Sequence, residues 1–404
     1  MPYYNTMIDS NSPNSNLLLR GARLIVPSGI GDAKDLLIEN GRIARILSSR
    51  ENFKGSSVNS IDLDGFSLFP GFIDVHIHGA AGVDTMEATT DELHRFADFL
   101  AREGVTSWLP TIVPASDEEY RRVAETVDQL IVEQRVRSTG ARAIGLHYEG
   151  PFVNHAQCGA LHTEHFKTYR DEAQLDSLPI LKTEGSRMMM TLAPEIERGV
   201  DLVRTLHDRD WIISIGHTRA LPEVLDRAHQ AGAHHMTHFM NAMAPLHQRS
   251  PGPVAWGLMR DDVSCDVVAD GIHLDPLMLR LLLKVKRPQR LSLISDSIAA
   301  AGMGDGEYKI WGETIKVSNG RTSNAAGSIA GSVITMLDAV RLMLTLGVSE
   351  VEAAGMASSN PARLLRLDND CGSIEEGKRA DLVALDERGR VRLTIIGGHV
   401  AFQQ

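Results

Sequence analysis

Cysteines and long apolar runs are scarce in this sequence, and each shortage excludes a class of protein. Only three cysteines occur among 404 residues, namely Cys158, Cys265 and Cys371. They form no Cys-x-x-Cys pair and cannot all pair within one chain, which argues against a disulfide framework and favours a reducing compartment. No run of about 18 apolar residues is present, so a membrane-spanning helix is not expected. Residues 1–16 are rich in Asn and Ser and lack the pattern of a secretion signal. They predict a poorly ordered tail on a cytoplasmic protein.

An excess of basic residues is also absent. Lys and Arg number 41 against 52 for Asp and Glu, which gives a formal net charge of −11 at pH 7. Neither nucleic acid nor a membrane is therefore expected as a partner. Apolar residues at 43% and charged residues at 23% are ordinary values for a globular protein. The length of 404 residues suits two or three domains, or one large barrel with an appendage.

The middle of the chain alternates short apolar runs with longer amphipathic stretches, which is typical of repeated βα units. Helices are expected at residues 90–103 and 118–133, where apolar residues recur at spacings of three and four. The strand candidates are eight runs: 72–78, 105–112, 142–150, 187–195, 211–217, 233–239, 264–271 and 291–297. Eight βα units favour a closed (β/α)8 barrel, but a doubly wound open sheet has the same local pattern, and periodicity does not separate the two.

Both ends of the chain have a different pattern, in which short alternating runs surround turn residues. Residues 17–64 contain the turn dipeptide Asn40-Gly41 between two apolar runs, and residues 380–402 alternate in a similar way. Two such segments can complete one small sheet domain between them.

Ionisable side chains stand at the downstream ends of several strand candidates. They are His76, His78, Glu149, His217, His238, His273 and Asp296. All strands of a barrel open their carboxyl ends on one face, so these groups are expected to converge there. His76 and His78 are two residues apart, and because side chains alternate along a strand, both imidazoles project to the same side. Imidazole and carboxylate are ligands of zinc or ferrous iron in hydrolases, where one position stays open for water.

Each of these residues also has an ordinary structural explanation when it is taken alone. A His-x-His pair is often two surface or core histidines, Glu149 can be a solvated loop carboxylate, and Asp296 can be a helix cap. All of these residues stand at the ends of predicted strands, however, and one shared site accounts for this better than separate structural roles do. We interpret Cys158 as a thiol without a chemical role. Residues 327–332 lack the lysine of a phosphate-binding loop. We expect them to form a turn and helix cap near the pocket where these ionisable side chains converge.

Longer motifs give the chain a resemblance to a known family. They occur in this order: PGFIDVHIHG (70–79), HYEGPF (147–152), GHT (216–218), THFMNAM (237–243), DGIH (270–273), SDSIAAAG (295–302), AGS (330–332), SSNPAR (358–363) and GSIEEGKRADLVALD (372–386). Over most of its length the chain resembles the amidohydrolase superfamily and, within it, the N-acetylglucosamine-6-phosphate deacetylase family. The resemblance implies a metal-dependent (β/α)8 barrel, expected at residues 70–364. It also implies a small β-sandwich domain formed by both termini, expected at residues 1–69 and 365–404.

The same resemblance implies the cofactor. Glu149, His217 and His238 resemble the ligands of the principal divalent metal ion, which is zinc or iron. His76 and His78 resemble the pair that supports a second ion in those members that have it. Whether one or two ions bind per chain stays open at this point.

The resemblance further implies the reaction and the residues around the substrate. Asp296 resembles the catalytic acid and base, and His273 resembles the histidine that positions the substrate. Arg249 resembles the phosphate-binding arginine, and Asn241 with Ala242 resembles the adjoining phosphate or sugar contacts. The implied activity is removal of the acetyl group from N-acetylglucosamine 6-phosphate, a small-molecule substrate, by a homodimer.

One segment departs from the family pattern. After EGPF the family has lysine and glycine followed by Ala-His, whereas residues 154–162 read NHAQCGALH, with no lysine and with His162 one place later. This segment is expected to shape the sugar pocket, so the galactosamine isomer of the substrate is an alternative. Two further alternatives are another amidohydrolase, such as a cyclic-amide hydrolase or a D-aminoacylase, and an inactive scaffold. Arg249 and the Asn-Ala-Met segment argue against the first, and the full set of ligands argues against the second.

Overall fold

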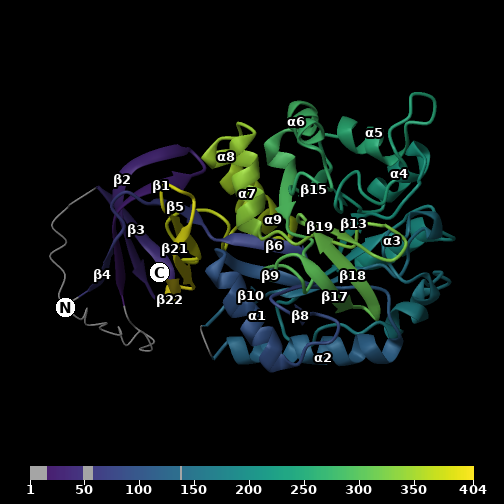
Figure 1. Ribbon diagram of the computed structural model, residues 1–404, viewed down its shortest axis with the longest axis horizontal. Helices are drawn as coiled ribbons and strands as arrows, with labels where there is room; N and C mark the ends of the chain where they lie inside the picture. The colour runs from purple at the N-terminus through teal and green to yellow at the C-terminus, as the bar shows by residue number, and fades with distance from the viewer. Residues whose placement is uncertain (1–15, 49–57, 137–138) are drawn as a thin grey trace.

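The chain folds into a barrel of parallel strands with a second, strand-rich sheet beside it (Figure 1). The structure is a computed structural model and describes residues 16–48, 58–136 and 139–404. The tail expected at residues 1–16 lies outside these ranges except for its last residue. No helix within the described ranges is both long enough and apolar enough to cross a membrane. All three cysteines are free thiols.

The eight strand candidates all become strands of the barrel. The candidate at 142–150 is divided at Ile144, so that nine strands result: β6 (Phe72–Ile77), β9 (Val105–Ile112), β10 (Arg142–Ala143), β11 (Gly145–Glu149), β12 (Arg187–Leu192), β13 (Ile212–Ile215), β14 (His235–Met236), β15 (Ser264–Val268) and β16 (Leu291–Ile294). β9 pairs with β6, β10 and β11, and the strands from β11 to β16 then pair in chain order, all of them parallel.

The sheet closes on itself at its carboxyl end. The backbone N–H of Asp296 donates to the carbonyl of His76 at 3.0 Å, and the N–H of His78 donates to the carbonyl of Ser297 at 2.8 Å. These bonds join the chain just beyond β16 to the first strand, β6. The fold is therefore the closed barrel and not the open sheet. Every residue of β6 and β9 is buried, as expected for strands covered by helices outside and filled by side chains inside.

Helices follow most of the barrel strands. They are α1 (Thr90–Arg102), α2 (Asp117–Gln134), α3 (Gly199–Asp208), α4 (Pro222–Gln230), α5 (Gly252–Met259), α6 (Pro276–Val285), α7 (Met336–Thr345), α8 (Glu350–Ala354) and α9 (Asn360–Leu364). Short helical turns lie between them: η1 (His155–Gln157), η2 (Thr163–His165), η3 (Glu172–Ser177), η4 (Pro288–Arg290) and η5 (Gly355–Ser359). α1 and α2 confirm the two helices expected from the sequence. Each begins with a capping box, formed by Thr89 with Glu92 and by Ser116 with Glu119.

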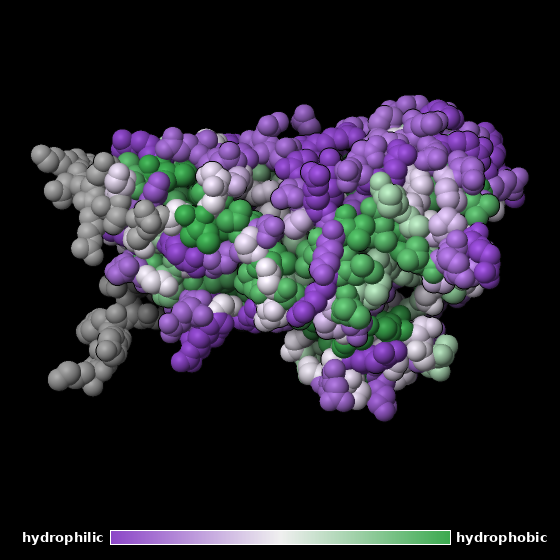
Figure 2. All heavy atoms as spheres, turned by 90° about the horizontal axis from the view of Figure 1, so that it is seen from above, coloured by the Kyte–Doolittle hydropathy of each residue, from purple (hydrophilic) through white to green (hydrophobic). Residues whose placement is uncertain are grey.

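Part of the helical layer leaves apolar side chains exposed. Seen from above, an apolar area lies among polar residues (Figure 2). On α6, which lies on this side of the molecule, Leu277, Leu281 and Val285 follow one another at every fourth position and are exposed by 73%, 40% and 42%. The other face of α6 buries Leu279 and Leu282 against the barrel.

Strands from both ends of the chain form the second sheet, as expected. They are β1 (Leu17–Val26), β2 (Gly29–Glu39), β3 (Arg42–Ser48), β4 (Asn59–Asp62), β5 (Ser67–Pro70), β20 (Leu382–Leu385), β21 (Val391–Ile396) and β22 (His399–Gln403). β5 pairs with β20, so the purple and yellow ends of the chain lie side by side in Figure 1. Asn40 and Gly41 form the turn between β2 and β3 and have positive φ angles of 51° and 75°. The barrel together with this sheet confirms the expected fold class.

Two small antiparallel sheets follow the first and last barrel strands. β7 (Gly79–Ala80) and β8 (Val83–Asp84) come directly after β6. β17 (Gly306–Ile310), β18 (Glu313–Ser318) and β19 (Arg321–Ser323) come after β16. The sequence patterns did not predict the three-stranded sheet.

Candidate functional site

Three of the expected site residues occupy the same position relative to their strands. His217, His238 and Asp296 are each the second residue beyond the end of a strand, β13, β14 and β16 respectively. Their φ angles are +48°, +30° and +50°. A non-glycine residue in this left-handed region is strained, and such strain concentrates at functional sites. The chain therefore turns sharply at the carboxyl end of each of these strands, with a polar side chain at the turn.

Glu149, His217 and His238 form a buried cluster at this end of the barrel. Oε1 of Glu149 lies 3.0 Å from Nε2 of His217 and 3.0 Å from Nε2 of His238. The two Nε2 atoms are 3.1 Å apart. Three potential metal ligands at the ends of three different strands thus form a nearly equilateral triangle.

The hydrogen bonding of His217 tests whether this triangle suits a metal ion. Nδ1 of His217 lies 2.7 Å from the carbonyl oxygen of Gln157, and because a carbonyl only accepts, Nδ1 carries a proton. In the neutral imidazole, Nε2 then directs its lone pair toward Glu149, which is also an acceptor. A tetrahedral zinc ion with bonds of about 2.0–2.1 Å has ligand-to-ligand distances of about 3.3 Å. The observed distances and the facing lone pairs both fit a divalent cation.

The pKa shifts of Glu149 and His76 agree with metal-binding protonation states. Burial alone would raise the pKa of the Glu149 carboxyl, but the nearby histidines, His76 first among them, reverse this and hold its pKa well below the ordinary value. Burial lowers the pKa of His76 well below the ordinary value. A carboxylate and a neutral imidazole are the forms in which these side chains bind metals. Burial would lower the pKa of His78 and of His238, but their contacts with the carboxylates of Asp296 and Glu149 outweigh burial and raise it.

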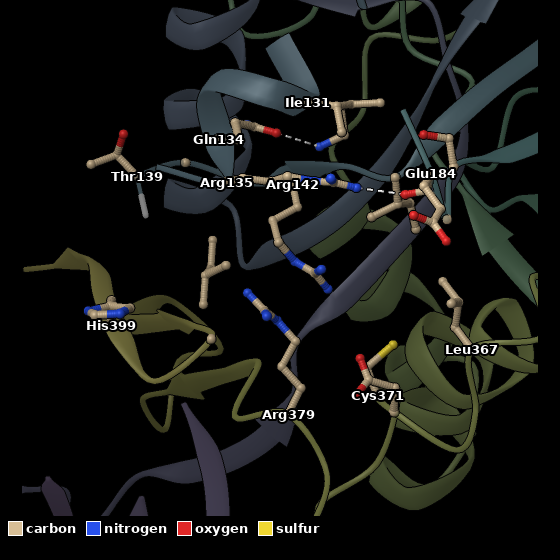
Figure 3. Close-up of a pocket in the computed structure, with 18 residues that line it drawn as sticks. Ile131, Gln134, Arg135, Thr139, Arg142, Glu184, Leu367, Cys371, Arg379 and His399 are labelled. Atoms are coloured by element: carbon tan, nitrogen blue, oxygen red, sulfur yellow. Dashed lines mark hydrogen bonds between the residues drawn. The ribbon is translucent and has the colours of Figure 1, made fainter. Parts of the chain in front are cut away.

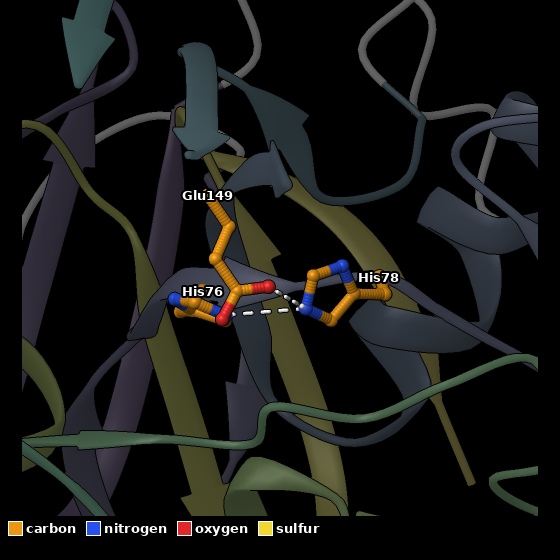
Figure 4. Close-up of side chains that lie close together, drawn as sticks. All are labelled: His76, His78 and Glu149. Carbon is orange, nitrogen blue, oxygen red and sulfur yellow. Dashed lines mark hydrogen bonds and ion pairs between the residues drawn. The ribbon is translucent and has the colours of Figure 1, made fainter. Parts of the chain in front are cut away.

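His76 and His78 form a second group that shares Glu149 with the first (Figure 4). Their Nε2 atoms are 3.1 Å apart. Nε2 of His78 lies 3.4 Å from Oε2 of Glu149, and Nε2 of His76 lies 3.7 Å from Oε1. The Glu149 carboxylate therefore faces both groups of histidines at once.

Asp296 lies against the second group. Its Oδ1 atom is 3.4 Å from Nε2 of His76 and 3.4 Å from Nε2 of His78. The Asp296 carbonyl accepts a 2.7 Å hydrogen bond from the backbone N–H of Ser332. Gly331 has a φ of +62°, and a Cβ atom at this position would lie 2.8 Å from the same carbonyl. The turn expected at residues 327–332 thus supports Asp296.

His273 is held by an aspartate that the sequence analysis did not single out. Oδ2 of Asp270 lies 2.6 Å from Nδ1 of His273, and Oδ1 accepts from the His273 backbone N–H at 2.7 Å. Burial would raise the pKa of Asp270, but these hydrogen bonds outweigh burial and lower it. The spacing of three residues within the DGIH motif was the available signal for this pair.

The three residues expected to contact the substrate do not all lie at the clusters. Asn241 and Ala242 lie in the turn after His238, where the Asn241 side chain donates to the His238 carbonyl at 3.2 Å. The Ala242 carbonyl accepts from the N–H of Thr218 at 3.1 Å. Arg249 lies on an exposed segment before α5, and its backbone N–H donates to Nδ1 of His247 at 3.3 Å. The structure therefore brings Asn241 and Ala242 to the clusters but leaves Arg249 outside them.

The atypical segment at residues 154–162 lies directly against a candidate ligand. The Asn154 N–H donates to the His217 carbonyl at 3.0 Å, and Gln157 accepts from the His217 ring. A Cβ atom at Gly159 would lie 3.6 Å from the same ring. Cys158 is half-buried and contacts the Gly159 carbonyl at 3.8 Å. A change of sequence here would change the surroundings of His217.

Two further residues border the site without having been expected there. Trp311, in the turn between β17 and β18, has its ring 5.3 Å from that of His78. Within the described part of the chain its buried Nε1 has no hydrogen-bond partner. Asp74, on β6, accepts from the backbone N–H groups of His76 and Ser295 at 3.3 Å each. A charged residue inside the apolar run FIDVHI was the signal for Asp74, whereas Trp311 belongs to the sheet that the patterns did not predict.

Comparisons with known proteins agree over nearly the whole chain. Residues 67–401 match the profile of the Amidohydrolase family. The chain is 36% identical to the N-acetylgalactosamine-6-phosphate deacetylase of Escherichia coli O157:H7, covering 95% of this chain and 99% of that protein. It is 34% identical to the N-acetylglucosamine-6-phosphate deacetylase of Bacillus subtilis, covering 96% and 97%. The crystal structure of N-acetylglucosamine-6-phosphate deacetylase from Thermotoga maritima superposes with a TM-score of 0.85 at 33% identity, covering 96% and 100%.

Proposed function

The chain belongs to the amidohydrolase family, and we propose that it removes the acetyl group from N-acetylglucosamine 6-phosphate. The products are glucosamine 6-phosphate and acetate. The observation that carries this proposal is the convergence of Glu149, His217 and His238 in one buried triangle, with Asp296 alongside. The two relatives compared above, both deacetylases of N-acetylhexosamine 6-phosphates, support the choice of substrate class.

Glu149, His217 and His238 would hold the principal metal ion, zinc or iron. His76 and His78, with the second oxygen of Glu149, would hold a second ion where one binds. Such an ion polarises a carbonyl group and lowers the pKa of water toward about 7. The Gln157 carbonyl, by fixing the proton of His217 on Nδ1, keeps Nε2 available as a ligand.

Asp296 serves as the proton carrier. Its carboxylate takes a proton from the attacking water and then gives that proton to the departing amine. The backbone bonds to His76 and Ser332 fix the position of this carboxylate. One side chain acting twice, first as a base and then as an acid, is sufficient because hydrolysis of an amide moves one proton from water to nitrogen.

His273 orients the acetyl group of the substrate. Asp270 binds its Nδ1 and its backbone N–H, which turns Nε2 away from the aspartate. When both ring nitrogens are protonated, Nε2 donates to the carbonyl oxygen as negative charge develops there. The Asp270 carboxylate then neutralises the imidazolium.

Arg249 binds the phosphate group, and Asn241 with Ala242 contacts the phosphate or the sugar. A guanidinium offers two parallel donors to a phosphate, which helps an acidic protein to bind an acidic sugar. Arg249 lies on an exposed segment. It reaches the phosphate from outside the buried clusters.

An acetate-release assay on a panel of sugars tests the proposal. N-acetylglucosamine 6-phosphate, N-acetylgalactosamine 6-phosphate and unphosphorylated N-acetylglucosamine are compared, with metal analysis of the same protein. We expect a much higher kcat/KM for a 6-phosphate than for the unphosphorylated sugar. Absence of acetate release from every 6-phosphate, in protein loaded with zinc or iron, would contradict the proposal.

The galactosamine isomer is the second candidate substrate. The atypical segment at residues 154–162 contacts His217, and a relative with 36% identity is a deacetylase of this isomer. The ratio of kcat/KM between the two 6-phosphates in the same assay decides between them. A ratio that favours N-acetylgalactosamine 6-phosphate would replace the leading proposal.

The remaining expectations also stand as proposals. They are a division into a barrel domain at residues 70–364 and a small domain from residues 1–69 and 365–404, a homodimeric assembly, and a cytoplasmic location.

A further inference from the structure

A second pocket lies at the opposite end of the barrel, at its junction with the strand-rich sheet (Figure 3). Its volume is about 410 Å³, within the range of small-molecule sites. We call it the junction pocket and define it by Arg142, Cys371, Arg379 and His399, which line it. Arg142 lies on β10, ahead of β11, whose far end carries Glu149. At about 3.3 Å per residue, the two pockets are separated by about 20 Å.

Two guanidinium groups in the junction pocket share one carboxylate. Asp381, 4% exposed, accepts from Nη2 of Arg142 at 3.1 Å and from Nε of Arg379 at 3.0 Å. The Gly397 N–H donates to the same carboxylate at 2.7 Å. Figure 3 shows the ends of the two arginine side chains directed toward one another across the pocket. Two positive charges and one negative charge leave an excess of one positive charge.

The hydrogen-bonding capacity of these arginines is only partly used. The buried Nε of Arg142 has no hydrogen-bond partner among the residues that the structure describes. Arg379 packs against a residue without a side chain, since a Cβ atom at Gly397 would overlap its guanidinium. The guanidinium of Arg379, whose side chain is 29% exposed, therefore lies beside the pocket with further N–H donors available.

The other charges of the lining do not cancel this excess. Asp370 forms its ion pair with Arg42 at 2.8 Å, and Arg135 donates to the backbone carbonyl of Glu184. The positive charges of Arg42 and Arg135 thus balance the negative charges of the two remaining carboxylates, those of Asp370 and Glu184. Cys371 adds no charge, because burial raises the pKa of its thiol to about 12.

We infer that the junction pocket binds a small phosphate-bearing metabolite, and that Arg142 and Arg379 bind its phosphate group. Two guanidinium forks facing one space match the geometry of a phosphate better than a single cation does. The volume leaves room for a body the size of a hexose beside the phosphate. Since β10 belongs to the barrel and Arg379 leads into β20 of the second sheet, the bound metabolite bridges both parts of the fold.

Binding is tested with glucose 6-phosphate, which has no acetyl group to lose. The catalytic pocket is first weakened for phosphate by Arg249→Ala, and the ligand is titrated calorimetrically into this protein. We expect a single equivalent to bind, and we expect Arg379→Met in the same background to weaken binding about tenfold or more. Arg204→Met, which removes an exposed arginine on α3, is the matched control and leaves the affinity unchanged.

Two further binding measurements, one with a second variant and one with a second ligand, can contradict the inference. Arg379→Lys retains the charge and lacks the fork, so it also weakens binding and serves if the methionine variant does not fold. Gluconate has a similar body with a carboxylate and no phosphate, and we expect it to bind more weakly. Three results would each overturn the inference. They are failure of glucose 6-phosphate to bind in the Arg249→Ala background, unchanged affinity for it in both Arg379 variants, and binding of gluconate as tight as that of glucose 6-phosphate. None of these readouts depends on acetate release.

Discussion

The carboxylate of Asp270 accepts a 2.6 Å hydrogen bond from Nδ1 of His273 and a second hydrogen bond from the backbone N–H of the same residue. Both oxygens of one aspartate are therefore used to orient one imidazole. Under the proposed function, the ring nitrogen that faces the substrate depends on this contact.

Asp270→Asn is expected to lower kcat by about tenfold or more while leaving the fold intact, because an amide does not fix the ring and its proton as a carboxylate does. Steady-state acetate release measures the effect. Asp275→Asn, at the N-cap of α6, is the matched control, since asparagine caps a helix as well as aspartate does. Equal activity of the two variants would contradict the orienting role.

Asp296→Asn tests the proton carrier itself. The side chain keeps its size but loses its basicity, so we expect turnover to fall by about 100- to 10,000-fold. Metal content and thermal unfolding are expected to stay close to wild type, because the candidate ligands are other residues. Acetate release at the wild-type rate would refute the role of Asp296.

Gly331→Ala tests the support behind Asp296. A methyl group there lies 2.8 Å from the Asp296 carbonyl at a φ of +62°, whereas a methyl group at Gly327, at a φ of +81°, would meet no atom of the described residues within 4 Å. Both alanine variants carry the left-handed strain of roughly 1–2 kcal/mol. Only Gly331→Ala is expected to lower kcat strongly. Equal losses of activity in the two variants would show that contact with Asp296 is irrelevant.

Arg249→Ala is expected to raise KM steeply for a 6-phosphorylated substrate and scarcely for the unphosphorylated sugar, since only the former has a dianion to bind. Parallel kinetics with both sugars measure this difference. Gln248→Ala, a neighbour on the same exposed segment, is the control. Equal effects of Arg249→Ala on both sugars would remove the phosphate assignment.

Removal of the metal is expected to lower both activity and the midpoint of thermal unfolding. An ion at 100 times its Kd stabilises the folded state by about 2.7 kcal/mol, and a chelator abolishes this stabilisation. Added zinc or iron restores both properties. Glu149→Gln weakens both ligand groups together, so a chelator should scarcely change its unfolding. A wild-type midpoint unaffected by the chelator would contradict the metal proposal.

The sequence alone was sufficient to predict the features that depend on a local residue pattern. The barrel strands follow from the eight apolar runs, and the positions of His217, His238 and Asp296 follow from where those runs end. The turn at Asn40-Gly41 follows from residues that tolerate positive φ. In each case the physical cause lies within a few residues of its effect.

Features that depend on distant contacts were not predictable in the same way. Closure of the barrel rests on backbone bonds between residues near 76 and residues near 296, which no periodicity contains. The contact between Trp311 and His78 needs a sheet whose strands are short and partly exposed. The position of Arg249 depends on the path of an exposed segment that lacks an apolar pattern.

The backbone bond from Asp296 to the His76 carbonyl also bears on how the protein matures during synthesis. β6 is the first barrel strand to leave the ribosome and β16 is the last. His76 and His78, at the end of β6, consequently acquire their contact with Asp296 only when the final strand completes the ring. A chain interrupted before that strand contains all five candidate metal ligands, His76, His78, Glu149, His217 and His238, but lacks Asp296.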